Sequence, residues 1–190
     1  MAPLNAEIFA RAWAQWYPDA NPFGYELRWV YQNRWLRIHH LPLSKRWPET
    51  SAECKEVLVR QNTVATDVLG AAMSCWLLGY DYDGATTLPA NHPLISLLSS
   101  APILSLPPED AESSPTTVFG GEVEWLPGRY DALLLAIAQD QLQALWIATD
   151  SGAVFAPYDG GADLIYPTAL RRDAARLRYK AWLSAHPEGL

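Results

Sequence analysis

Residues 145–156 read LWIATDSGAVFA, and this stretch decides the class of fold. Two short apolar runs, 145–149 and 153–156, stand on either side of Asp150-Ser151-Gly152. Asp, Ser and Gly favour turns for backbone reasons, and two strand-like runs joined by a short turn predict a β-hairpin. The strands of a hairpin are antiparallel, so the stretch favours a sheet that is antiparallel or mixed.

Helix and strand patterns alternate on both sides of this hairpin. Apolar residues at helical spacing predict helices at 5–16, 50–69, 130–140 and from 167 to about 185. Short apolar or alternating runs predict strands at 25–31, 35–39, 74–78, 122–125 and 164–166. Together they predict a single α+β domain over residues 1–190, with an antiparallel or mixed sheet packed with about four helices.

One long segment, residues 86–117, fits neither pattern. It contains six prolines, several serines and the acidic cluster Glu109-Asp110-Glu112. We expect a long Pro/Ser-rich acidic loop there, with one short helix near 94–98. Loops of this length inside compact domains are usually functional or mobile, so the segment is a candidate binding region.

Charge is distributed unevenly along the chain. The formal net charge is −7, yet residues 61–170 hold thirteen carboxylates and a single base, Arg129. A surface biased in this way repels nucleic acid and anionic lipid and attracts basic partners at range. The first seven residues lack the features of a signal peptide, and no apolar run reaches the roughly 18 residues that span a membrane. We therefore expect a cytoplasmic protein with no nucleic-acid or membrane partner.

Tryptophan is unusually frequent, with nine in 190 residues, alongside nine Tyr and four Phe. A buried Trp needs a partner for its N–H, so this number implies either a Trp-rich core or an aromatic surface for a partner, and the core is favoured. The two cysteines, Cys54 and Cys75, are too few for a disulfide framework and lack metal-ligand spacing. We interpret them as buried free thiols.

Two pairs of aspartates stand near glycines at the ends of predicted strands. Asp81 and Asp83 flank Tyr82, and in an extended chain their carboxylates would share one face, where a cation or acid–base chemistry could use them. Asp159 and Asp163 bracket a Gly-Gly-Ala loop that lacks the lysine of a phosphate-binding loop, which disfavours phosphate. For both pairs a structural turn is the favoured interpretation.

No catalytic motif is present elsewhere in the sequence. His39 and His40 are adjacent in a predicted strand, so their side chains point to opposite faces and cannot readily share a metal. The chain contains no G-x-S-x-G, Walker, Rossmann or zinc pattern, and neither cysteine has the basic surroundings of a reactive thiol. No cofactor is expected.

Two stretches taken together resemble a known family. They are WLRIHHLPLSKR at 35–46, followed by Asn62-Thr63-Val64, and PYDGGADLI at 157–165, followed by a helix with Tyr179, Trp182 and Leu183. They resemble a family of small uncharacterised bacterial proteins, some of which lie beside predicted secreted toxins as candidate immunity proteins. The second stretch is also similar to a short domain of unknown function, which usually has Arg where Gly160 stands here. The resemblance supplies no catalytic residues and raises the expectation of an immunity function.

Three functions remain open from the sequence. The favoured one is a non-enzymatic acidic binding protein, most concretely a cytoplasmic immunity protein for a basic toxin domain, because an acidic inhibitor associates quickly with a basic target. The alternatives are a housekeeping or scaffold protein whose acidity serves solubility, and a metal-assisted hydrolase that uses the two aspartate pairs. The residues expected to bind the partner are Asp81, Asp83, Glu109, Asp110, Glu112, Asp159 and Asp163.

Overall fold

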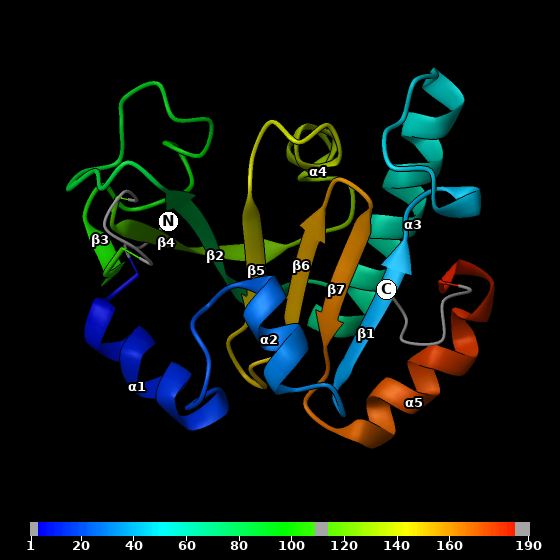
Figure 1. Cartoon of the computed structure of the whole chain (residues 1–190), viewed down its shortest axis with the longest axis horizontal. Helices are drawn as coiled ribbons and strands as arrows, with labels where there is room; N and C mark the ends of the chain where they lie inside the picture. The colour runs from blue at the N-terminus through cyan, green and yellow to red at the C-terminus, as the bar shows by residue number, and fades with distance from the viewer. Residues whose placement is uncertain (1–3, 109–113, 185–190) are drawn as a thin grey trace.

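An antiparallel sheet forms the centre of the computed structural model, which describes residues 4–108 and 114–184 (Figure 1). Within these residues the sheet has seven strands, in the order β1-β7-β6-β5-β2-β4-β3. The hairpin predicted from residues 145–156 is confirmed, since β5 pairs antiparallel with β6 and Trp146 lies opposite Phe155. The strands are β1 (Trp35–His39), β2 (Met73–Asp81), β3 (Pro102–Leu106), β4 (Thr116–Trp125), β5 (Ala144–Ala148), β6 (Val154–Tyr158) and β7 (Gly161–Ile165).

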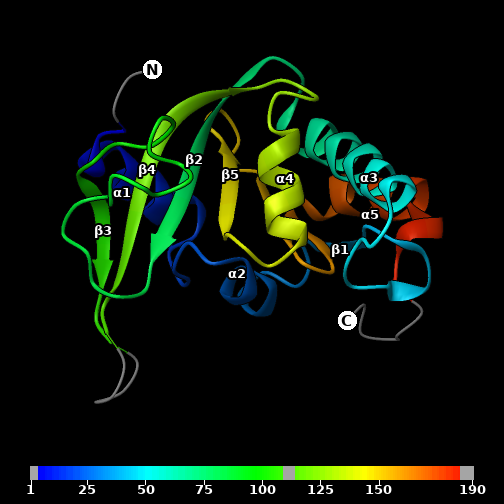
Figure 2. The ribbon, with the colours of Figure 1, turned by 90° about the horizontal axis from the view of Figure 1, so that it is seen from above.

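Helices cover both faces of the sheet, and the described residues form a single α+β domain (Figure 2). One apolar layer lies between the sheet and α1 and α2, and the other lies between the sheet and α3, α4 and α5. Successive strand residues point to opposite faces, so Leu77 enters one layer and Leu78 the other. The helices are α1 (Ala6–Trp16), α2 (Gly24–Val30), α3 (Ser51–Leu69), α4 (Asp131–Ala138) and α5 (Ala169–Arg178), with short 3-10 turns at η1 (Pro42–Ser44) and η2 (Lys180–Trp182).

Local capping signals fix the ends of α3. The Thr50 hydroxyl accepts the Glu53 backbone N–H at 3.2 Å, and the Glu53 carboxylate accepts the Thr50 backbone N–H at 3.1 Å. This reciprocal pair satisfies two backbone donors that the helix itself leaves unpaired. Gly70 ends the helix with a φ of 87°, in the left-handed region that favours glycine. Both ends of this helix agree with the sequence-based expectation.

The strand predicted at 25–31 is wrong, because Gly24–Val30 form helix α2. The alternation of residues along this segment suggested a half-buried strand, yet Trp29 is 58% exposed while Leu27 is fully buried. Phe23 and Leu27, four residues apart, are both buried, which is helical spacing. The alternation of aromatic and other side chains thus resembled the pattern of a strand, whereas the buried positions of the segment follow the helical period.

The long loop predicted at 86–117 is shorter than expected. Pro102–Leu106 form the edge strand β3, and β4 already begins at Thr116. A strand that begins with proline is tolerated at a sheet edge, where one backbone donor is not required. Residues 94–98 form turns in place of the predicted short helix, and the leucines at both ends of this segment are buried.

Tryptophan contributes to both the core and the surface. Trp125 and Trp146 are fully buried and meet edge to face, with ring centroids 5.7 Å apart. Trp29 and Trp47 are 58% and 51% exposed. The Trp-rich core expected from the sequence is therefore present, and part of the aromatic surplus is left at the surface.

Both cysteines are free thiols, as expected. Cys75 is buried in β2, and burial raises the pKa of its thiol to about 12, so it stays protonated and unreactive at neutral pH. Cys54 on α3 is only half-buried, which corrects the expectation that both would be buried.

Candidate functional site

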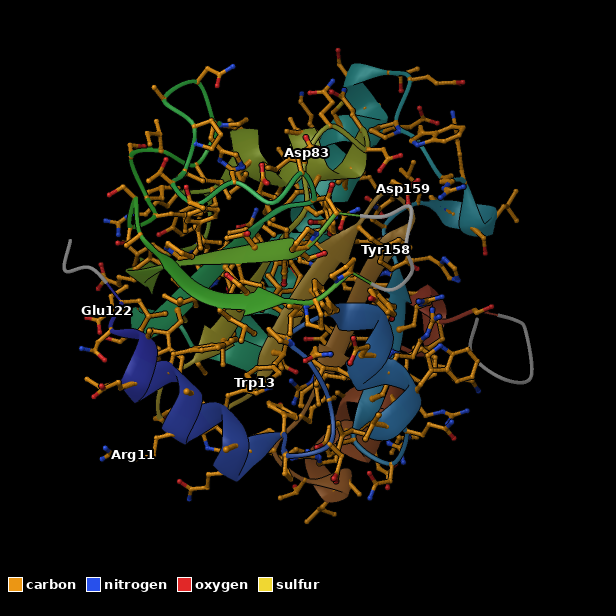
Figure 3. All side chains as sticks on the ribbon, turned by 60° about the vertical axis from the view of Figure 1, so that its left-hand side comes forward. Arg11, Trp13, Asp83, Glu122, Tyr158 and Asp159 are labelled. Atoms are coloured by element: carbon orange, nitrogen blue, oxygen red, sulfur yellow. The ribbon has the colours of Figure 1, made fainter. Side chains whose placement is uncertain are left out.

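A cavity of about 520 Å³ lies where the β6–β7 turn leaves the sheet, which is a typical size for a small-molecule site. Its walls come from α2, β1, the end of β2, the α4–β5 loop and the turn itself. Figure 3 shows Tyr158 and Asp159 at this end of the molecule, with Asp83 at the same end and Arg11 at the opposite end. We call this cavity the turn pocket; its polar lining includes Arg28, Arg37, His39, Arg46, Asp159 and Asp163.

The pairing of β1 with β7 brings these residues together. Arg37 lies opposite Asp163, and His39 lies opposite Gly161. Alternation along β1 sends its leucine and isoleucine into the α3 layer, so Arg37 and His39 face the pocket. A Cβ at position 161 would overlap the backbone carbonyl of Ile38, so the close approach of the two strands requires glycine there.

A buried ion pair anchors the pocket wall. Arg37 Nε and Nη2 donate to the two oxygens of Asp163, each at 2.9 Å, and Trp35 Nε1 donates to Oδ1 at 2.8 Å. The side chains of Arg37 and Asp163 are only 11% and 7% exposed. The Arg37 guanidinium also lies 4.8 Å from the centre of the Tyr158 ring. Asp163 is therefore the counterion that orients Arg37, and its carboxylate is already occupied.

Asp159 has a similar role in the turn. It is buried, and its Oδ2 forms an ion pair with Arg46 Nε. The two acids of the Pro157–Asp163 stretch thus hold two arginines at the pocket.

The two histidines lie on opposite faces of β1, as expected. The His39 ring lines the turn pocket, and its Nε2 is buried without a hydrogen-bond partner in the described part of the chain. His40 is buried on the other side, with Nε2 2.9 Å from the Arg46 carbonyl and Nδ1 3.3 Å from Gln61 Nε2. Burial lowers the pKa of both rings, because a charged imidazolium would lose its hydration.

We expect His40 to make the protein less stable in acid. The unfolded chain takes up a proton near the ordinary histidine pKa of 6.5, whereas the buried ring resists protonation. The contribution of His40 is therefore fully present above this value and is lost as the pH falls below it. Replacing His40 with Gln should weaken the fall in the free energy of unfolding between about pH 7.5 and about pH 5, measured by urea denaturation. A pH dependence identical to that of the wild type would contradict the assignment.

Arg28 differs from Arg37 and Arg46 because no carboxylate of the described residues forms an ion pair with it. Its side chain is half-buried, and within residues 4–108 and 114–184 it makes no ion pair or hydrogen bond, with Nε shielded from water. The guanidinium lies 5.1 Å from the centre of the Trp29 ring. Burial raises the pKa of the Tyr158 hydroxyl, and the positive charges of Arg37 and, to a smaller extent, Arg28 oppose this shift. The wall of the pocket thus contains one guanidinium that forms no ion pair with a carboxylate of the described residues.

Four aromatic rings form a continuous strip at the edge of the pocket. Tyr25 stacks on Phe23 at 5.4 Å, Phe23 contacts Tyr80 at 5.2 Å, and Tyr80 stacks on Tyr82 at 6.3 Å between ring centroids. The two ends, Tyr25 and Tyr82, are 48% and 47% exposed. We call these four residues the aromatic strip. It presents large, conformationally restricted rings to a partner.

Asp81 and Asp83 lie at the end of β2 next to this strip. Asp81 Oδ1 accepts the backbone N–H groups of Asp83 at 3.1 Å and Ala85 at 2.8 Å, which is the turn favoured from the sequence. Neither aspartate lines the turn pocket, so the two aspartate pairs do not share that cavity. Glu109, Asp110 and Glu112, the remaining residues expected to bind a partner, lie outside the described residues.

Sequence reasoning overlooked the arginines that line the pocket. Arg28 lies in a segment that the sequence pattern predicted to be a strand, and no function was predicted for Arg37. The available signal was the alternation of residues 35–39, which places Arg37 and His39 on the same face. Their surroundings depend on Asp163, which is 126 residues from Arg37 in the chain, and no local pattern gives that pairing.

A second, larger cavity of about 1020 Å³ opens on the other face, between α4 and residues 93–97. Its lining is largely apolar and includes Val123, Leu133 and Leu142. Within the residues that the structure describes, no group of three or more His, Cys, Asp or Glu side chains is placed to hold a metal ion. The turn pocket is the stronger candidate because charged and polar groups converge there.

Comparison with known families gives a match over most of the chain. The model of a family described as a domain of unknown function, DUF3885, matches residues 23–187, which include α2 and all the strands described above. No curated protein and no solved structure matches the chain. Among the residues of the structure that are described, none of the helices is both long enough and apolar enough to cross a membrane.

Proposed function

We propose that this chain, which belongs to the DUF3885 family, is a non-catalytic binding protein that docks a basic protein partner beside the turn pocket. In its most specific form, the proposal is a bacterial immunity protein that neutralises a toxin domain in the cytoplasm. The observation that carries it is the aromatic strip, whose exposed ends lie next to exposed and half-exposed carboxylates.

The aromatic strip has the composition of an interface hot spot. Tyr, Trp and Arg dominate the residues that contribute most to binding energy, because they bury a large area at a small cost in side-chain entropy. Tyr25 and Tyr82 are each backed by another ring, so their orientation is already restricted before a partner arrives. Trp29, on the same helix as Tyr25, adds a further exposed ring.

The distribution of charge supports a basic partner. Asp83 is exposed and Asp81 half-buried beside Tyr82, and Asp140 is exposed on the α4–β5 loop. All three belong to residues 61–170, the segment with thirteen carboxylates and one base. Exposed carboxylates around aromatic anchors would raise the association rate with a basic protein, with a strong dependence on salt.

The other two functions have less support from the geometry. A metal-assisted hydrolase needs free carboxylates that converge, whereas Asp159 and Asp163 are paired with arginines and Asp81 accepts two backbone N–H groups. A housekeeping protein whose acidity serves only solubility gives no reason for an ordered aromatic strip at the surface. We therefore retain the binding function as the proposal.

We expect Tyr82→Ala and Asp83→Lys to weaken binding to the partner in different ways. The partner would first be isolated from native cells by affinity capture at low salt, eluted at high salt, and identified. Losing the exposed ring should raise the dissociation rate by about tenfold or more, since hot-spot rings act after docking. Asp83→Lys should mainly lower the association rate and the dependence of that rate on salt. Both rates would be measured by surface plasmon resonance.

Asp150→Lys is the matched control for the charge reversal. Asp150 is an exposed residue of the same acidic segment, but it lies in the β5–β6 turn at the opposite end of the strands. The control should leave the association rate nearly unchanged. The absence of a saturable basic partner, or equal effects of the two charge reversals together with no effect of Tyr82→Ala, would refute the proposed function.

A further inference from the structure

The turn pocket contains buried polar atoms that the protein itself does not satisfy. Among the described residues, Arg28 Nε and His39 Nε2 are shielded from water without a hydrogen-bond partner, and both residues line this cavity. Leaving such groups unpaired is energetically costly, so proteins normally pair them with their own groups, water or a ligand. Their convergence on one cavity indicates a site for a polar ligand.

The pairing of charges within the wall favours an anionic ligand. The acids Asp163 and Asp159 are paired with Arg37 and Arg46, so these four charges compensate one another within the wall. Arg28 makes no ion pair in residues 4–108 and 114–184. Asp140 also lines the cavity, but it is exposed and water screens its charge. A half-buried guanidinium without a counterion favours an anion, and its planar donors match a carboxylate or a phosphate.

The rest of the lining favours a ligand that also carries a flat ring. Phe23, Tyr25, Tyr80 and Tyr158 all line the cavity. Aromatic walls with a few converging polar groups are typical of pockets for small organic ligands. Aromatic rings pack against such walls in stacked or edge-to-face arrangements.

We propose that the turn pocket binds a small aromatic oxyanion, an aryl phosphate or aryl carboxylate, with Arg28 as its counterion and the surrounding aromatic rings as its apolar walls. His39 Nε2, in the tautomer that carries its proton on this nitrogen, donates a further hydrogen bond to the anion. This ligand site goes beyond the proposed protein-docking function: the ligand enters the cavity, the partner contacts the exposed ends of the aromatic strip, and Tyr25 belongs to both surfaces.

Calorimetric titration of the full chain with phenyl phosphate tests this proposal. We expect saturable binding at one site, weaker binding of benzoate, and no saturable binding of benzamidine, a flat ring of similar size with the opposite charge. Arg28→Gln should weaken the affinity for phenyl phosphate by about tenfold or more, because it removes the charge that pairs with the anion. Arg28→Lys should retain part of the affinity, since it keeps the charge and loses the planar fork.

Arg11→Gln is the matched control, because Arg11 is an exposed arginine on α1 at the opposite end of the molecule (Figure 3). It removes the same charge and should leave the affinity unchanged. Amide chemical-shift changes in the wild type, expected at Tyr158 to Gly161, locate the ligand without reference to any variant. The proposal is overturned if phenyl phosphate does not saturate, if benzamidine binds as tightly, if Arg28→Gln and Arg11→Gln behave alike, or if the shift changes lie elsewhere. None of these outcomes depends on the protein partner, so the two proposals fail separately.

Discussion

Asp163→Ala is expected to lower the free energy of unfolding by about 3–5 kcal/mol, the usual cost of removing one member of a buried ion pair. The substitution leaves the Arg37 guanidinium buried without a counterion and deprives Trp35 Nε1 of its acceptor. Both groups are partly shielded from water, so solvent compensates them only in part. The change would be measured as a shift of the urea midpoint at neutral pH.

The matched control for this prediction is Glu124→Ala. Glu124 and Arg129 form an exposed ion pair at 3.3 Å, with side chains 48% and 47% exposed. Exposed pairs contribute about 0–1 kcal/mol, so the control should lose much less stability. The double variant Arg37→Met/Asp163→Leu should also be less damaging than Asp163→Ala, because it removes both charges together. If Asp163→Ala lost no more than Glu124→Ala, the buried pair would not contribute as described.

Trp125→Ala is expected to destabilise the fold by about 3–5 kcal/mol, the range for deleting a large buried aromatic side chain. Trp125 is fully buried, stacks on Tyr130 at 5.6 Å and meets Trp146 edge to face at 5.7 Å. Its Nε1 donates to the Thr66 hydroxyl at 3.0 Å. Alanine would leave a cavity between the sheet and the α3–α4 layer and would remove this hydrogen bond.

Thermal and urea unfolding of Trp125→Ala would be compared with Trp47→Ala. Trp47 is 51% exposed and contacts the Arg46 guanidinium, so its removal should change stability by only about 0.5 kcal/mol. Trp125→Phe should fall between the two, since it keeps a ring in the layer but cannot donate to Thr66. Similar losses for Trp125→Ala and Trp47→Ala would show that the buried cluster does not dominate the core.

Local signals predicted the parts of the fold that depend on local chemistry. The turn residues at 150–152 predicted the β5–β6 hairpin, and apolar residues at helical spacing over 50–69 predicted α3, because turns and single helices form between residues close in sequence. Residues 25–31 were misassigned because aromatic alternation outweighed the helical spacing of Phe23 and Leu27. Burial against the rest of the fold determines the secondary structure of this segment, and a short stretch of sequence does not show which residues will be buried.

The site was less accessible to sequence reasoning than the fold. Asp159 and Asp163 were identified as notable residues, but as acids offered to a partner. The structure shows them as counterions of Arg46 and Arg37. Arg37 lies in β1, and Arg46 lies in the loop between η1 and α3. The role of a carboxylate depends on its neighbours in space, and here those neighbours are more than a hundred residues away in the chain. The acids of the 86–117 segment, Glu109, Asp110 and Glu112, stay a prediction.

The pairing of β1 with β7 also determines when the pocket can exist during synthesis. β1 is an edge strand whose ladder partner is made only when the ribosome has reached residues 161–165. Until then Arg37 and His39 have no partner strand, because Asp163 and Gly161, the β7 residues that lie opposite them, have not yet been synthesised. Strand pairings that span most of a sequence also slow folding, because a long loop must close first. Binding competence should therefore arise only after residues 161–165 have been synthesised and β7 has joined β1.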